Sequence, residues 1–112
     1  MNQIKIVNLT AHDISIVRPD GTTLIVKTNG SVARVATETE KIEPWAGLDI
    51  EFFSQIEGEV TGLPEPGYRT LFLVSLAVRK AVPTRFDVVS PGELVRDEKG
   101  RPVGCRGLVT NF

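Results

Sequence analysis

The sequence predicts a small, soluble α+β domain, mostly antiparallel β-sheet, with one short helix in a compact β-α-β unit at about residues 70–90. Short segments in which apolar and polar residues alternate recur along most of the chain, and this pattern is typical of half-buried strands. Turn-forming combinations of Asp, Asn, Pro and Gly separate the segments, as they do in successive hairpins. A continuous apolar run at 70–74, followed by a short helical stretch, predicts the β-α-β unit.

The N-terminal half predicts five short strands. They lie at residues 4–7, 14–17, 24–26, 31–37 and 48–52. The turn Arg18-Pro19-Asp20-Gly21 joins the second and third strands, because proline presets φ and glycine accepts a positive φ. Residues 41–47 are predicted to be irregular around Trp45, and the Gly- and Pro-rich segment 58–67 is predicted to be a loop.

The strand at 70–74 is expected to be buried on both faces, with Leu71, Leu73 and Val74 in the core. Ser75 can cap a helix over 76–82, which Pro83 ends. Residues 86–90 then form the next strand. The crossover has about the minimum length for two parallel strands, so an antiparallel return is also open.

Pro91-Gly92 is predicted to close the strand at 86–90. A last hairpin over 94–103 turns at Asp97-Glu98-Lys99-Gly100, with glycine at the position that a type I turn with a bulge prefers. The aromatic residues are expected to lie mostly in the core. An exposed platform on which nucleic acid bases stack is the alternative.

Length and composition limit the function further. A chain of 112 residues predicts a single domain, residues 1–112, with no need of a metal or disulfide to fold. The net charge of −1 disfavours duplex DNA binding, since phosphate contacts dominate that affinity. No apolar run reaches the roughly 18 residues of a membrane helix. One cysteine, Cys105, and no signal-peptide pattern predict a cytoplasmic location, the host cytoplasm for a viral protein.

Five segments together resemble a known group of proteins. They are residues 7–12, 62–66, 70–81, 85–92 and 95–105. The resemblance is to small uncharacterised proteins of bacteria, archaea and their phages that open with a VNLTPH-like string. This chain has Ala11 where that string has proline, so its turn is expected to differ. The resemblance implies a prokaryotic or viral origin and a stand-alone domain, and it supplies no catalytic residues.

A candidate anion site centres on Ser75, where a strand meets a helix start and backbone N–H groups attract anions. Ser90 and Gly92 end the next strand and would lie at the same edge of the sheet if the two strands run parallel. Arg85 and Arg96 could grip a phosphate bidentately. In the structural alternative, Ser75 only caps the helix and the glycine only turns the chain.

His12 is the only histidine, and it forms a polar cluster with Asn8 and neighbouring residues. Histidine is well suited to proton transfer near neutral pH, so His12 with Ser75 or Cys105 could serve a small hydrolase or transferase. Such polar clusters also stabilise turns without any chemistry.

The sequence therefore favours a non-catalytic binding module for a small anionic ligand such as a nucleotide, or for a protein partner, in a role that would fit a phage–host setting. The first alternative is the hydrolase or transferase. The second is a structural or assembly protein whose strand edges form homo-oligomers, and self-association is expected. No cofactor, metal or membrane partner is expected.

Overall fold

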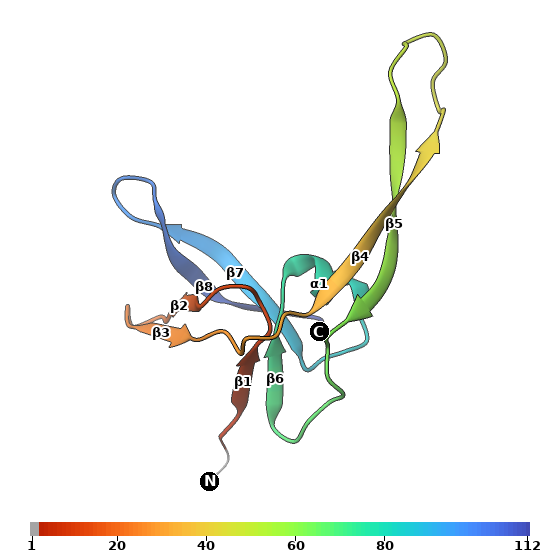
Figure 1. Cartoon of the computed structure of the whole chain (residues 1–112). Coiled ribbons are helices and arrows are strands. Elements are labelled where there is room, and N and C mark those ends of the chain that lie inside the picture. Colours follow the sequence, from red (N-terminus) through yellow and green to blue (C-terminus); the bar gives the residue numbers. More distant parts are fainter. Residues whose placement is uncertain (1–2) are drawn as a thin grey trace.

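The protein is mostly β with one short helix, as predicted, in a computed structural model that describes residues 3–112 (Figure 1). The elements are β1 (Lys5–Asn8), β2 (Ile14–Val17), β3 (Thr23–Val26), β4 (Arg34–Ile42), β5 (Phe52–Thr61), β6 (Thr70–Leu73), α1 (Leu76–Ala81), β7 (Val88–Arg96) and β8 (Pro102–Thr110). Over residues 3–112, no helix is both long and apolar enough to span a bilayer.

Six strands form one sheet in the order β1-β6-β7-β8-β2-β3. The sheet is mixed: β1–β6, β6–β7 and β2–β8 are parallel, whereas β2–β3 and β7–β8 are antiparallel. The prediction of a mostly antiparallel sheet therefore holds only in part. Asn8, at the end of β1, bridges to Thr28, just after β3, and its carbonyl accepts a hydrogen bond of 2.8 Å from Asn29 N. This contact curls the sheet into a nearly closed barrel.

The β-α-β unit lies where the sequence places it, and its two strands are parallel. Phe72 and Leu73 of β6 pair with the first two residues of β7, and Val74 N donates to Val89 O at 2.8 Å. Ser75 is the N-cap of α1, as predicted, and its hydroxyl accepts a hydrogen bond from Val78 N. The short crossover suffices because α1 has only six residues.

The prediction that Pro91-Gly92 closes the strand is wrong. Strand β7 continues to Arg96 and forms a long hairpin with β8. Pro91 lies within the strand pairing, opposite Leu108. The next residue is a glycine because β7 and β8 approach closely there. A Cβ atom at Gly92 would lie 2.1 Å from the carbonyl oxygen of Arg106. The glycine that predicts a turn is therefore part of the strand.

The core lies between the sheet and α1. Leu73 and Val74 are fully buried, as predicted, whereas Leu71 is only half-buried. Val74 belongs to a buried cluster that also draws on the turn after β1, the residue before β4, β6, α1 and the start of β7: Leu9, Ala33, Phe72, Val78 and Val88. Of the described aromatic residues, Phe72 is buried, but Trp45, Phe53 and Tyr68 are exposed. The prediction that most aromatic side chains lie in the core is therefore wrong.

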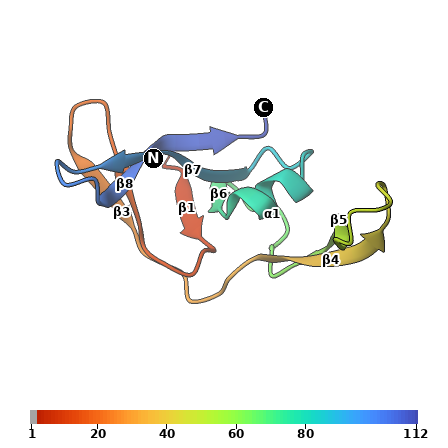
Figure 2. The ribbon, with the colours of Figure 1, turned by 90° about the horizontal axis from the view of Figure 1, so that it is seen from above.

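Strands β4 and β5 form a second, separate sheet, a hairpin that we call the arm (residues 34–61). The arm projects from the six-stranded sheet, on the side away from the β7–β8 hairpin (Figures 1 and 2). The molecule measures 62 × 40 × 26 Å, and its radius of gyration is 17.5 Å. A compact domain of this length has a radius of gyration of about 13 Å. We call the described residues outside the arm the body.

The sequence patterns misplace most of the arm. The predicted strand at 31–37 starts at Arg34 and runs on to Ile42, and the predicted strand at 48–52 is mostly the loop at the end of the hairpin. Part of the predicted loop at 58–67 belongs to β5. Every residue of β4 except Val35 is exposed, so no apolar alternation marks the strand. Position 58 of β5 is a glycine for a steric reason, because a Cβ atom there would lie 2.5 Å from the carbonyl oxygen of Ala36.

Candidate functional site

Asn8 is a buried structural residue. Its Nδ2 donates to the carbonyl oxygens of His12 (2.9 Å) and Val26 (2.8 Å), and its Oδ1 accepts from the backbone N–H and the hydroxyl of Thr10. These four hydrogen bonds hold the turn after β1 against the end of β3. The asparagine therefore has no hydrogen-bonding capacity left for a ligand.

His12 is exposed and lines a shallow apolar groove together with the buried Cys105. Among the hydrogen bonds of residues 3–112, none joins the imidazole to Cys105 or Ser75. The Cys105 thiol instead lies 3.5 Å from Gly107 O. The pairing that a hydrolase or transferase would need is not formed in this arrangement.

Ser90 is fully buried, and its hydroxyl accepts a 2.8 Å hydrogen bond from Arg79 Nε. Arg79 also donates through Nη1 to Asn111 Oδ1 at 3.0 Å, and Asn111 Nδ2 lies within 3.0–3.3 Å of three carbonyl oxygens at and after the end of α1. The C-terminal segment thus fastens the helix to the sheet. Sequence reasoning missed this network because its partners lie up to 32 residues apart.

Arg85 binds Asp87 with two parallel hydrogen bonds, Nε to Oδ1 at 2.8 Å and Nη2 to Oδ2 at 2.9 Å. It also donates to Pro64 O at 3.0 Å, so it ties the loop before β6 to the turn before β7. These hydrogen bonds hold the pKa of Asp87 below its usual range, and they raise the pKa of Arg85. Arg96 donates to Gly100 O at the far end of the β7–β8 hairpin. Arg85 precedes β7 and Arg96 ends it, so the two arginines lie toward opposite ends of that strand and do not grip one ligand together.

Ser75 is the one residue of the predicted anion site that lines a cavity. This cavity, of about 320 Å³, lies between the start of α1, the turn after β1 and the base of the arm, and Arg34 and Ala77 also line it. A helix of six residues has a weak dipole, however, and the Ser75 hydroxyl already accepts a hydrogen bond from its own helix. The serine is therefore primarily a cap.

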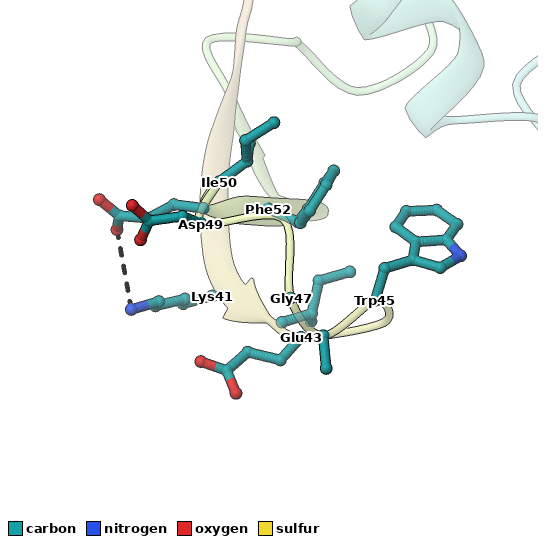
Figure 3. A pocket seen from close by; sticks show the side chains of 10 residues that line it. Lys41, Glu43, Trp45, Gly47, Asp49, Ile50 and Phe52 are labelled. Atoms are coloured by element: carbon teal, nitrogen blue, oxygen red, sulfur yellow. Dashed lines mark ion pairs between the residues drawn. The ribbon is translucent and has the colours of Figure 1, made fainter.

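The arm tip, residues 43–51, is the feature that sequence reasoning missed. Trp45, Leu48 and Ile50 are 63%, 56% and 62% exposed. Trp45 and Ile50 line a hollow of about 430 Å³ (Figure 3). Trp45 packs edge-on against Phe52, with ring centroids 5.1 Å apart. The tip thus displays apolar side chains to solvent, held by a hairpin that shares no strand pairing with the body.

Charge is divided unevenly between the arm and the rest of the chain. The arm carries seven acidic and two basic residues, a net charge of −5, whereas the rest of the chain carries seven acidic and eleven basic residues, a net charge of +4. The near-neutral total conceals this asymmetry. Only a division of the chain at residues 34 and 61 reveals it, and those boundaries come from the fold.

A second apolar groove, the base groove, lies between the arm and α1. It has a volume of about 440 Å³. Its lining residues are Val35, Thr37, Gln55, Ile56, Leu76, Ala77 and Lys80. The groove adjoins the Ser75 cavity, since both are lined by Val35, Thr37 and Ala77. Among the side chains that the structure describes, neither Lys80 nor Arg34 forms an ion pair.

Comparisons of the chain with protein-family models, with curated proteins and with proteins of known structure found no match. In the part of the chain that the structure describes, no three His, Cys, Asp or Glu side chains gather where they could hold a metal ion. The arm and the grooves of the body are therefore the features from which a function can be argued.

Proposed function

We propose that this protein is an assembly module whose arm binds a second copy of the same chain. The observation that supports the proposal is the apolar arm tip, with Trp45, Leu48 and Ile50 all more than half exposed at the end of a separate hairpin. A two-stranded hairpin is marginally stable in water by itself, and grouped apolar side chains on a surface are typical of interaction sites. A protein surface that covers the tip would remove this apolar area from water.

The charge asymmetry favours a second copy as the partner. An arm with a net charge of −5 attracts a positively charged surface, and the rest of the same chain carries +4. The arm points away from its own body, so the positive surface that it meets belongs to another molecule (Figures 1 and 2). Complementary potentials of this kind speed the encounter and disfavour other partners.

This proposal develops the alternative of a structural or assembly protein that forms homo-oligomers, with an apolar hairpin tip in place of the strand edges that the sequence suggested. A small anion bound by Ser75, Ser90 and Arg85 has less support, because each of these side chains is already engaged within the body. A catalytic role for His12 also has less support, because among the described residues its imidazole is hydrogen-bonded to neither Cys105 nor Ser75.

The mass in solution tests the proposal. We expect sedimentation equilibrium to give a mass above the 12.2 kDa monomer, falling toward the monomer on dilution and with added salt. Trp45→Ala should shift the equilibrium to monomer. Tyr68→Ala is the matched control, because Tyr68 is an aromatic residue of the body that is 86% exposed. A wild-type protein that stays monomeric at millimolar concentration and low salt would refute the proposal.

A further inference from the structure

We infer that the arm tip of one copy binds in the base groove of the second copy, so that the two arms run in opposite directions and are in contact at tip and base, without pairing their β4 edges. This inference rests on the proposed function and names the receiving surface. It explains why one molecule exposes two apolar features that it does not bring together, the tip at one end of the arm and the groove at the other.

The base groove has the apolar surface that the tip needs. Leu76, the first residue of α1, is 51% exposed at its wall, and Ile56 of β5 is 44% exposed. The volume of about 440 Å³ lies within the range of sites that hold a small ligand or a few side chains. Side chains such as Trp45 and Leu48 can therefore fill the groove and remove its apolar walls from water.

The charges at the two ends of the arm are complementary. The tip carries Glu43, Asp49 and Glu51, of which only Glu51 has an ion-pair partner, Lys41 at 3.8 Å. Lys80 lines the base groove, and Arg34 lines the adjoining cavity. Neither of these two cations forms an ion pair with another described residue. Binding of the tip would place the carboxylates of Glu43 and Asp49 beside the cationic groups of Lys80 and Arg34.

The charges along the middle of the arm oppose the simplest alternative, a dimer formed only by pairing two arm edges. Glu38 and Glu40 lie in the middle of β4, and like charges placed opposite one another across strands are destabilising. Charged side chains on an edge strand are also a known way to prevent edge-to-edge pairing. Attraction is therefore concentrated at the ends of the two arms, where tip and base meet.

The geometry allows the contact to close on itself. The tip and the base groove are separated by the length of β4, about 30 Å for nine residues. Two arms that run in opposite directions each place their tip at the base of the other. The tip of the first copy then contacts the groove of the second, and the reverse, which is the reciprocity of a two-fold dimer. No other copy is needed to cover either surface.

Complementation between two defective variants tests the assignment. Trp45→Ala removes the tip but keeps the groove, and Leu76→Glu keeps the tip but puts a negative charge in the groove. Each variant alone should be monomeric. A mixture retains one intact tip–groove contact, so native mass spectrometry should detect a 1:1 complex of the two variants. If Leu76→Glu alone still forms dimers like the wild type, or if the mixture gives no 1:1 complex, the assignment of the groove is wrong.

Lys80→Glu is a second variant of the groove. Its matched control is Lys99→Glu, at an exposed lysine of the β7–β8 loop. We expect the dissociation constant to rise roughly tenfold or more for the first variant, because the charge of a contact is reversed, and to change less than twofold for the second. Equal effects of the two substitutions would mean that only net charge matters. That result would overturn the assignment of the groove.

Trp45 is the only tryptophan, so its fluorescence reports directly on the tip. Emission should move to shorter wavelength as the protein concentration rises, and Leu76→Glu should abolish this change while the far-ultraviolet circular dichroism stays that of the wild type. Self-association that depends on Trp45 but not on Leu76 or Lys80 would refute this inference and leave the proposed function standing. A wild-type protein that is always monomeric would refute both.

Discussion

The body and the arm are both built from β-strands, but they are stabilised in opposite ways. In the body, Leu73, Val74 and Val88 are completely buried, and the buried polar residues Asn8 and Ser90 have hydrogen-bond partners. In the arm, every residue of β4 except Val35 is exposed. The body therefore has a buried core that its own elements build, whereas the arm lies outside that core except at its base.

The difference shows what a second layer contributes to a sheet. Strands β6 and β7 are covered by α1, and packing of this kind makes a strand stable within one chain. The arm has such cover only at its base, where Val35 and Val60 pack against the buried cluster. The rest of the hairpin gains backbone hydrogen bonds but buries little, so packing within the chain contributes little to its stability. Substitutions matched between the two regions should therefore differ sharply in effect.

The largest difference is expected for truncation of an apolar side chain. Leu73→Ala should lower the free energy of unfolding by about 2–5 kcal/mol, because it leaves a cavity in the core. Phe53→Ala, at a side chain of the arm that is 57% exposed, should lower it by no more than about 0.5 kcal/mol. Urea denaturation of the two variants measures both values. A small loss for Leu73→Ala would mean that β6 is not a core strand.

The next largest effect concerns two glycines that lie close to a backbone carbonyl. Gly92→Ala would put a Cβ atom 2.1 Å from Arg106 O, and the forced separation of β7 and β8 should cost about 1–3 kcal/mol. Gly58→Ala creates a similar clash with Ala36 O in the arm. We expect it to weaken self-association while the midpoint of thermal unfolding changes little. Equal losses of stability would show that the arm and the body unfold as one unit.

A third comparison uses pH and two ion pairs. Arg85 lowers the pKa of Asp87 in the folded protein, so the stability that this pair contributes is complete above the unfolded pKa of about 4 and is lost as the pH falls through the lowered folded pKa. Asp87→Asn should cost about 1.5 kcal/mol at neutral pH and progressively less below about pH 4. Glu51→Gln, in the exposed pair with Lys41, should cost less than about 0.5 kcal/mol at any pH. Urea titrations across this pH range measure the two profiles, and parallel profiles would contradict the comparison.

The smallest effect on stability is expected from the largest change in sequence. An Asn-Gly turn in place of residues 40–54 would close the hairpin at the Thr39–Gln55 pair and remove the tip. The unfolding free energy of the monomer should stay within about 0.5 kcal/mol of the wild-type value, since little of the removed segment is buried. Sedimentation should give a monomer at every concentration. A shortened protein that fails to fold would show that the arm is part of the core.

Local patterns were sufficient where one stretch of chain carries its own signal. The apolar run at 70–74, the capping serine and the proline after α1 predict a buried strand and a helix, and the structure confirms both. The turn at Arg18-Pro19-Asp20-Gly21 is confirmed for the same reason, because proline and glycine restrict or permit particular φ values whatever the surroundings. The alternation of apolar and polar residues likewise predicted a β-rich chain, and the structure confirms it.

Long-range contacts decided the remainder. Whether β6 and β7 are parallel, why Gly92 and Gly58 lie inside strands, and which residues Asn8 and Ser90 bind all depend on segments far away in the sequence. The candidate site depends on the same information. The sequences of β4 and β5 give no sign that the two strands leave the body as a separate hairpin. The charge asymmetry exists only once that separation is known, because charge acts through distances in space and not through order along the chain.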